Sequence, residues 1–336
     1  MSNNQKLLIW LNVTIFLLIL MIMIGGITRL TDSGLSMVTW KPIMGVIPPI
    51  SHQDWVHSFE EYKAFPEYNL KNINMSLSEY KTIFFWEYLH RMIGRFFGFL
   101  FVIPFTIFLI KGYLNKELIV KLIFLFVLGG MQGFIGWYMV KSGLVDKPDV
   151  SHYRLALHLF LAFIILSFTY KLKLSLLYKK IDKIKSYDFY NRFSTVIIIL
   201  LFVQIIFGAF NAGLKTVDSV STFPFYNGML FPISKMSIDP FWLNFFENNF
   251  GVQIIHRYLA GLIVLIAGYF VLNLSKDSKR IIFESKYLIS LVLYQCILGV
   301  LTLVSNATLV FALFHQILAI LLIMLMVRIK HKIKYI

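Results

Sequence analysis

Eight long apolar stretches dominate this chain of 336 residues and restrict what it can fold into. They cover roughly 7–26, 83–110, 119–140, 153–172, 194–213, 253–274, 284–304 and 309–328. A run of about 20 apolar residues is long enough to cross a bilayer as a helix. The chain is 58% hydrophobic and 15% charged, which is more apolar than a soluble domain of this length can bury. We therefore predict an all-α polytopic membrane protein with eight transmembrane helices.

The net charge of +15 is distributed as the topology of such a protein requires. If the N-terminus is cytoplasmic, 19 of the 32 lysines and arginines lie on the cytoplasmic side, in the N-terminal tail, the 111–121, 171–192 and 275–286 loops and the C-terminal end. Nine lie in the longer outer loops, and Arg91, Arg95, Arg154 and Arg257 lie in the spans. Positive charge accumulates on the cytoplasmic side of membrane proteins. We therefore expect both termini in the cytoplasm and a surface that meets lipid headgroups, not nucleic acid.

The cysteine content and the first apolar run give information on the cellular location of the protein. Cys296 is the only cysteine and lies within a span, so an intramolecular disulfide is excluded. The first apolar run is too long for a signal-peptide core, and the segment before it lacks the character of a transit peptide. We expect a retained first helix in a bacterial inner membrane.

Four histidines, His90, His158, His256 and His315, lie inside four different spans. Ionisable side chains are costly in a bilayer, so a histidine there indicates a functional site. With the topology above, all four fall one to two helical turns inside the outer face. Two imidazoles from opposing helices can hold a haem iron from both sides. The four histidines therefore predict two bis-histidine haem or metal sites.

The two halves of the chain repeat each other. EYLHR around His90 matches QIIHR around His256, and ALHLFLA around His158 matches LFHQILA around His315. The third and seventh spans each carry a glutamine followed four residues later by a glycine. Because each half has an even number of spans, both halves enter the membrane in the same orientation. We expect two parallel four-helix repeats, 1–190 and 191–336, related by a pseudo-twofold axis along the membrane normal.

One position distinguishes the halves chemically. Glu87 lies three residues before His90 on the same helical face, whereas Gln253 occupies the matching position before His256. A carboxylate can move a proton or stabilise a developing cation, and an amide can only hydrogen-bond. The alternative is a structural ion pair of Glu87 with Arg91 or Arg95.

Arg91 and Arg257 directly follow these histidines. Their guanidinium groups could bind haem propionates through paired hydrogen bonds. They could equally reach lipid phosphates.

Two polar segments of some length, 27–82 and 214–252, follow the first span of each half. Ser76 and Glu79 form the pattern of a capping box for the helix leading into the second span. Residues 52–65 carry Trp55, Phe59 and Tyr62 at helical spacing. This spacing predicts either an interfacial helix that covers the site or an ordinary amphipathic surface helix.

Five longer motifs resemble the haem A synthase family, specifically its mitochondrial and alphaproteobacterial branch. They are GGITRLTDSGLSMVTWKPIMGVIPP at 25–49, FFWEYLHRMIGR at 84–95, QGFIGWYMVKSGL at 132–144, SHYRLALHL at 151–159 and NFFENNFGVQIIHR at 244–257. Another branch has a cysteine pair in the first outer loop, and residues 27–82 contain no cysteine. Asn211 stands where a small or apolar residue is expected.

The resemblance implies an eight-helix oxidoreductase that converts the C8 methyl group of haem O to the formyl group of haem A. It implies two successive hydroxylations and loss of water from the resulting gem-diol. His90 and His158 would hold the substrate haem O, and His256 and His315 would ligate the iron of a haem b cofactor. Glu87 matches the essential carboxylate of the family. Expected partners are a haem O synthase, cytochrome oxidase assembly factors, an electron donor and a second copy of the chain.

Two other classes of protein remain open at this point. A dihaem cytochrome b that takes electrons from quinol also needs four histidines on four helices, but it does not explain the difference between Glu87 and Gln253. A transporter with parallel repeats predicts broken helices at matching positions. Only Pro104 interrupts the middle of a span.

Overall fold

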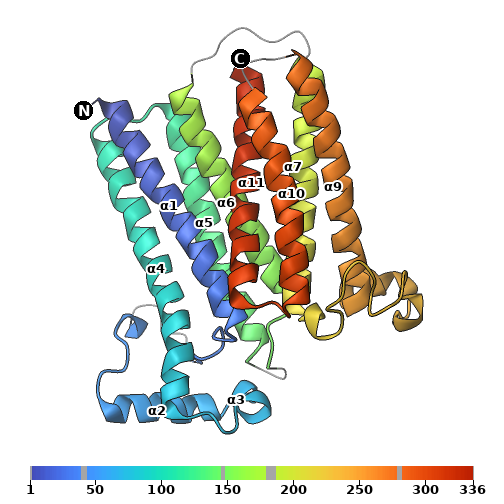
Figure 1. Cartoon of the computed structure of the whole chain (residues 1–336). Helices are drawn as coiled ribbons and strands as arrows, with labels where there is room; N and C mark the ends of the chain where they lie inside the picture. The colour runs from blue at the N-terminus through green and yellow to red at the C-terminus, as the bar shows by residue number, and fades with distance from the viewer. Residues whose placement is uncertain (1, 39–43, 145–147, 179–186, 278–281, 336) are drawn as a thin grey trace. The chain divides into compact units, whose positions relative to one another are not determined.

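A computed structural model describes residues 2–38, 44–144, 148–178, 187–277 and 282–335, and it is built from helices (Figure 1). Eight helices in these ranges are long and apolar enough to cross a membrane, which confirms the predicted fold class. They are α1 (Asn3–Leu30), α4 (Leu77–Ile110), α5 (Lys116–Ser142), α6 (His152–Leu177), α7 (Tyr187–Gly213), α9 (Asn249–Asp277), α10 (Ile282–Val304) and α11 (Leu309–Tyr335). Of the charged residues counted above, Lys41, Lys147, Lys179, Lys180, Lys183, Lys185, Lys279 and Arg280 lie outside the described ranges.

The helices extend beyond the apolar runs because their ends are capped by polar residues. A bilayer offers no hydrogen bonds to the backbone, so a spanning segment must satisfy its own. The predicted capping box is present: Ser76 accepts from the Glu79 backbone, and Glu79 accepts from the Ser76 backbone. Asn115 caps α5 in a similar way by accepting from Leu118. Pro104 lies inside α4, and the helix continues through it.

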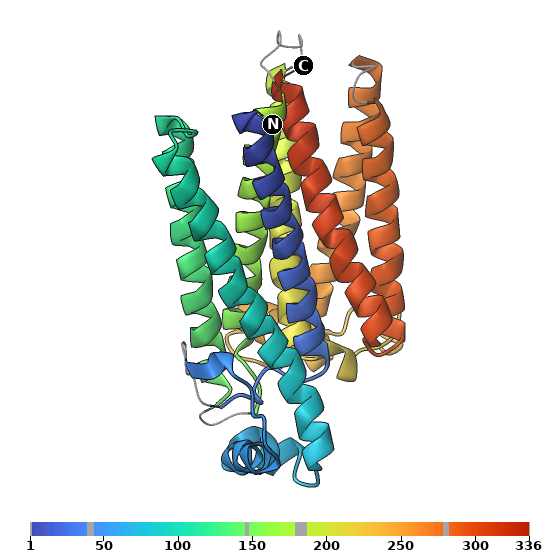
Figure 2. The same ribbon diagram turned by 90° about the vertical axis from the view of Figure 1, so that its left-hand side faces the viewer.

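The chain divides into two compact units, which are described separately. One consists of Met1–Ile15 and Phe163–Ile336, and the other of Phe16–Ala162. In the first unit, α9 packs against α7 and α10, and α11 packs against the same two helices. The four helices therefore form a closed bundle, whose members run side by side in Figures 1 and 2.

The unit 16–162 contains the corresponding elements of the first half. α4 packs against α5. The C-terminal part of α1 meets α4 where Thr28 lies 3.4 Å from the carbonyl oxygen of Trp86. The side chain of Gln132 on α5 hydrogen-bonds His158 on α6. The helix contacts in this unit thus follow the order α1, α4, α5, α6.

Residues 52–72, here called the α2–α3 cap, fold against the N-terminal end of α4. The cap contains α2 (His52–Lys63) and α3 (Pro66–Lys71), which lie beside the start of α4 in Figures 1 and 2. The predicted helix over 52–65 is therefore confirmed. Phe59 and Tyr62 are buried and stack on Tyr80 of α4, with ring centroids 5.0 and 5.3 Å apart. The aromatic face of α2 is thus packed against protein.

The corresponding segment of the second half has no such helix pair. It contains the short turns η2 (Thr216–Asp218), η3 (Ile233–Lys235) and η4 (Phe241–Leu243), followed by the single turn α8 (Asn244–Glu247). Asn211, the unexpected residue at the end of α7, accepts a hydrogen bond from Thr216 at 2.7 Å and donates to the Phe207 carbonyl. It therefore fixes the exit of the chain from the helix.

Candidate haem sites

The N-terminal site is formed by His90 on α4 and His158 on α6. Both imidazoles are half-buried, and they are close enough to interact electrostatically. Each ring lies against a glycine of a neighbouring helix. A Cβ atom at Gly25 of α1 would lie 3.3 Å from Nε2 of His90, and one at Gly136 of α5 would lie 2.9 Å from Cε1 of His158. A side chain at Gly136 would therefore overlap the ring of His158, and one at Gly25 would press closely on the ring of His90.

The C-terminal site repeats this arrangement with His256 on α9 and His315 on α11. These rings are also half-buried and lie close to each other. A Cβ atom at Gly208 of α7 would lie 3.3 Å from Cε1 of His256. At Gly299 of α10, it would lie 3.1 Å from Cε1 of His315. The structure thus brings the four predicted histidines together as two pairs.

Glutamine side chains hold three of the four rings. Gln132, Gln204 and Gln295 place their amide nitrogens 3.3 Å from Nε2 of His158, His256 and His315, respectively. Since an amide nitrogen only donates, Nε2 of each ring is the acceptor and carries the lone pair. The amide nitrogens of Gln132 and Gln204 also donate to the backbone carbonyl of the same histidine.

Both pairs fit a haem better than a free metal ion. In the described residues, no cluster of three or more His, Cys, Asp or Glu side chains could hold a metal ion. A haem needs only two protein ligands, since the porphyrin supplies four nitrogens, and an imidazole is a common axial ligand. Nδ1 of His158, His256 and His315 is buried without a hydrogen-bond partner. Since Nε2 of these rings accepts from a glutamine, Nδ1 carries the ring hydrogen, and Nε2 is the nitrogen that can bind iron once the glutamine has moved away. The glycines let each imidazole pack against a neighbouring helix, which fixes the position of the ring.

Glu87 lies beside the N-terminal site, with a side chain that is only 3% exposed. Its Oε2 accepts hydrogen bonds from the Ser36 hydroxyl at 2.7 Å and from the Met37 backbone at 2.8 Å. Its Oε1 pairs with the guanidinium of Arg91 at 2.5 Å. The ion pair with Arg91 considered from the sequence is therefore present, whereas no Glu87–Arg95 contact occurs in the described chain. Every partner of Glu87 is a donor.

Gln253 occupies the matching position in the C-terminal site with the same exposure. Its amide nitrogen donates to the Val220 carbonyl at 2.9 Å and lies 3.3 Å from the Thr216 hydroxyl. Its Oε1 accepts from Arg257 at 2.6 Å. Glu87 thus ties the connecting segment after α1 to α4 through an acid. Gln253 ties the connecting segment after α7 to α9 through an amide.

The two arginines also contact the connecting segments. Arg91 donates to the Met37 carbonyl at 3.0 Å. Arg257 donates to the Thr222 carbonyl at 2.9 Å, and its guanidinium lies 4.2 Å from the centre of the Tyr226 ring. Each guanidinium has five N–H donors, so these bonds do not exhaust its capacity.

The α2–α3 cap is connected to Glu87 through Tyr80. The Tyr80 hydroxyl lies 2.7 Å from the Ser58 hydroxyl of α2 and 3.4 Å from the carbonyl oxygen of Ser36, whose side chain donates to Glu87. Inside the cap, Glu67 is 3% exposed and accepts from the Tyr62 hydroxyl at 2.9 Å. Burial raises the pKa of Glu67 to about 7. A second buried carboxyl group therefore lies in the same unit as Glu87.

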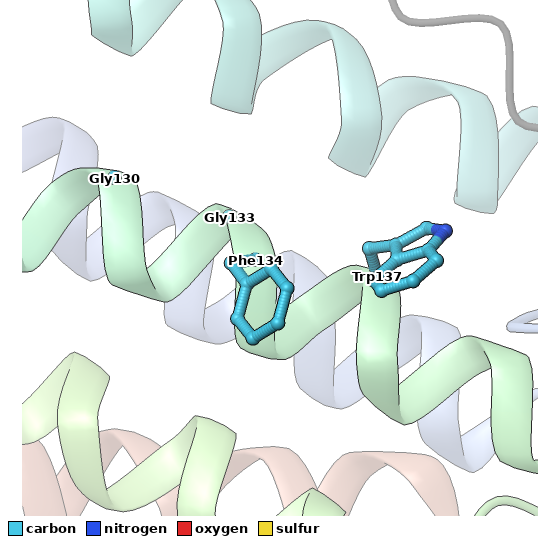
Figure 3. A pocket seen from close by; sticks show the side chains of 4 residues that line it. All are labelled: Gly130, Gly133, Phe134 and Trp137. Carbon is cyan, nitrogen blue, oxygen red and sulfur yellow. The ribbon is translucent and has the colours of Figure 1, made fainter.

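An apolar hollow of about 460 Å³ lies on another face of α5 (Figure 3). Gly130, Gly133, Phe134 and Trp137 line it, and a Cβ atom at either glycine would meet nothing within 4 Å. It contains none of the four histidines and none of the charged residues above.

Sequence reasoning missed several residues that the structure places at the sites. Gln204 and Gly208 were hidden because the first and fifth spans match only loosely. Ser36 and Met37 could not be assigned, because their contact with Glu87 depends on how the connecting segment folds. Glu67 carried no signal in the sequence, since most glutamates in polar loops are exposed.

Eight candidate membrane-spanning helices that carry two histidine pairs are typical of membrane haem proteins. The family model described as COX15-CtaA, cytochrome oxidase assembly protein, matches residues 8–327. The chain therefore belongs to this family. "Heme A synthase" of Wolbachia pipientis wMel is 42% identical over 310 residues, which cover 92% of this chain and 87% of that protein.

Two relatives from other bacteria match over more of the chain. "Heme A synthase" of Nitrosospira multiformis is 39% identical, covering 98% of this chain and 94% of its own length. The protein of the same name from Flavobacterium psychrophilum is 42% identical, covering 96% of both chains. The family resemblance seen in the sequence motifs is thereby confirmed.

Proposed function

We propose that this protein is a haem A synthase that oxidises the C8 methyl group of haem O to a formyl group. The similarity to proteins named "Heme A synthase" along nearly the whole chain supports this function. The observation that carries the assignment of the two sites is the exchange of Glu87 for Gln253 in otherwise matching surroundings. In each of two methyl hydroxylations, molecular oxygen is the oxidant: one oxygen atom enters a C–H bond, and the other is reduced to water with two electrons from the donor and two protons. The second hydroxylation gives a gem-diol that loses water to form the aldehyde.

In this proposal, His90 and His158 ligate the iron of the substrate haem O. Glu87 acts next to the substrate as the catalytic carboxylate. Held by Ser36, Met37 and Arg91, it has a fixed position from which it can stabilise a developing cation or accept a proton. The α2–α3 cap supports this position through the bond of Tyr80 to the Ser36 carbonyl.

His256 and His315 are the residues that would hold the iron of a resident haem b. When bound, a haem b supplies one-electron transfer. The C-terminal site suits a permanent cofactor, since its buried residue three positions before His256 is the amide Gln253, which has no acid–base chemistry.

Arg91 and Arg257 are the proposed anchors for the haem propionates, each for the haem of its own half. The carboxylate of Glu87 neutralises Arg91, whereas no carboxylate pairs with Arg257 in the described residues. Arg257 thus retains its positive charge for an incoming propionate, and we expect it to be the stronger anchor of the two.

We further propose two parallel repeats, 1–190 and 191–336, in the bacterial inner membrane with both termini in the cytoplasm. A haem O synthase, cytochrome oxidase assembly factors, an electron donor, membrane lipids and a second copy of the chain are the proposed partners. Reporter fusions at Asn72 and Gly112, which only α4 separates, test the topology. A periplasmic signal at Asn72 and a cytoplasmic one at Gly112 are expected, and the reverse contradicts the proposal.

The haem content of the purified protein tests the function. It is produced with a haem O synthase in a host that makes no haem A, and its haems are extracted and separated. We expect haem A together with haem b, and accumulation of haem O when Glu87 is replaced by glutamine. Two equivalents of haem b without haem A would instead indicate a dihaem cytochrome b.

A further inference from the structure

The glycine against which each of the four proposed ligand histidines packs is preceded, one turn earlier on its helix, by a position that can be compared among the four. These positions are Met21 before Gly25, Gln132 before Gly136, Gln204 before Gly208 and Gln295 before Gly299. Three of the four are glutamines that contact the ring of their histidine. The methionine is therefore the exception, and it belongs to the proposed substrate site.

Met21 cannot replace the hydrogen bond that the glutamines make. A thioether sulfur has no hydrogen to donate. The terminal methyl group of Met21 instead lies against α4, 3.5 Å from where a Cβ atom at Gly94 would stand, one turn after His90. In the described part of the chain, no side chain hydrogen-bonds a ring nitrogen of His90, in contrast to the other three histidines.

This difference affects how readily each ring can bind iron. Nε2 of a neutral imidazole has a single lone pair, so it cannot accept from an amide and ligate a metal at the same time. At His158, His256 and His315, the glutamine must release the ring before iron binds. His90 requires no such release. Relative to an unhindered ring, one neutral hydrogen bond reduces the affinity roughly two- to tenfold.

We propose that Met21 makes His90 the first ligand of the substrate haem, with His158 binding second, after Gln132 has released its ring. This inference rests on the proposed function and extends it to the order of ligation. A site that repeatedly takes up substrate benefits from one ring that is available at once. The proposed cofactor site has a glutamine on both rings and is filled once.

Haem binding by the full-length protein in detergent, carrying its resident haem, tests the order. Reduced haem O is mixed rapidly with the wild type, and absorbance follows a five-coordinate phase and then a six-coordinate phase. In Met21→Gln, we expect the first phase to slow roughly two- to tenfold. Met21→Leu is the matched control, since it keeps an apolar side chain and should bind as fast as the wild type. Gln132→Met should leave the first phase unchanged and accelerate the second.

The outcomes separate this inference from the proposed function. An unchanged or faster first phase in Met21→Gln overturns the role of Met21, and so does equal slowing in Met21→Leu, which would indicate packing alone. A resident haem spectrum like that of the wild type shows that each variant is folded. If the wild type itself binds no haem O, the proposed function fails, whatever the variants do.

Discussion

The N-terminal and C-terminal sites share one scaffold and differ at two buried positions. In both, two histidines fit against glycines of neighbouring helices, and an arginine one turn beyond Glu87 or Gln253 contacts the connecting segment. Glu87 of the N-terminal site corresponds to Gln253 of the C-terminal site, and Met21 corresponds to Gln204. Both exchanges put the amide in the C-terminal site. The histidines and their glycines are common to both sites, whereas the buried acid Glu87 and the thioether of Met21 belong to the N-terminal site alone.

The acid and the amide also organise their surroundings in opposite ways. Glu87 receives hydrogen bonds from the segment Ser36–Met37, whereas Gln253 donates to Thr216 and Val220. The segment after α1 therefore presents donors to Glu87, and the segment after α7 presents acceptors to Gln253. The Glu87 carboxylate accepts from Ser36 and Met37 in addition to Arg91. These additional donors support its proposed catalytic role over a purely structural ion pair.

Loss of a proposed iron ligand should have the largest effect. We expect His256→Ala or His315→Ala to remove the haem b completely, since a haem held by two imidazoles loses one of its two iron bonds. His90→Ala should retain the haem b. A pyridine haemochrome spectrum per mole of protein measures this. Equal loss of haem b from all three variants would mean that the two sites are not distinct.

Exchange of the acid and the amide should have the next largest effect. Glu87→Gln should lower haem A formation at least about 100-fold, the lower range for loss of an acid–base group. The amide keeps the volume and can still accept from Arg91, so the haem b content should remain. Turnover is measured by separating haem O from haem A after extraction.

Gln253→Glu is the matched control for that exchange. It creates the acid in the C-terminal site, where the Val220 carbonyl would face a carboxylate without a donor between them. We expect weaker haem b retention but no second site of haem oxidation. Haem A formation by Glu87→Gln at near wild-type levels would assign Glu87 a structural role with Arg91.

The arginines should show a smaller difference between the two sites. A charge-assisted hydrogen bond contributes about 1.5–3 kcal/mol, which corresponds to roughly a tenfold or larger change in affinity. Arg257→Leu should weaken haem b retention by this factor, and Arg91→Leu should chiefly raise the haem O concentration needed for turnover. Lysine at either position should restore only part of the affinity, because it lacks the paired donors. Unchanged haem occupancy in all four variants would indicate contact with lipid phosphates.

The eight spans and the four intramembrane histidines were predictable because their signals are local. Apolar runs specify the eight spans, and the capping box of Ser76 and Glu79 specifies where α4 begins. The repeat aligned His90 with His256 and pointed to Gly136 and Gly299. Each of these features depends on spacing within one helix or on comparison between two.

The surroundings of the histidines were not predictable because they depend on contacts between distant segments. Ser36 lies 51 residues before Glu87, and Gln204 lies 52 residues before His256. An irregular segment between two helices has no helical spacing, so its sequence does not show which of its residues contact a distant helix. Burial of Glu67 likewise results from packing inside the α2–α3 cap, where Tyr62 donates to Glu67 and Asn72 donates to Tyr62. No local sequence pattern predicts these contacts.

The α2–α3 cap itself is the last difference between the two regions, and we expect its pH dependence to have the smallest effect on haem content. Burial raises the pKa of Glu67 to about 7, so the folded cap keeps a proton that the opened cap loses near its ordinary value of 4.5. The cap is therefore most stable below that ordinary value. Its stability falls as the pH rises to about 7, by about 3 kcal/mol in total.

Glu67→Gln should remove this dependence, because the amide can still accept from Tyr62 but does not ionise. The measurement is backbone hydrogen exchange of residues 52–72 in the variant relative to the wild type at pH 5.5, 7 and 8.5, since the ratio cancels the intrinsic effect of pH. The variant should become increasingly protected relative to the wild type as the pH rises. Glu60→Gln, which alters an exposed carboxylate paired with Lys63 on the same cap, should show no such trend. A ratio independent of pH for Glu67→Gln would mean that Glu67 stays ionised in the folded cap, and burial would then not set its protonation.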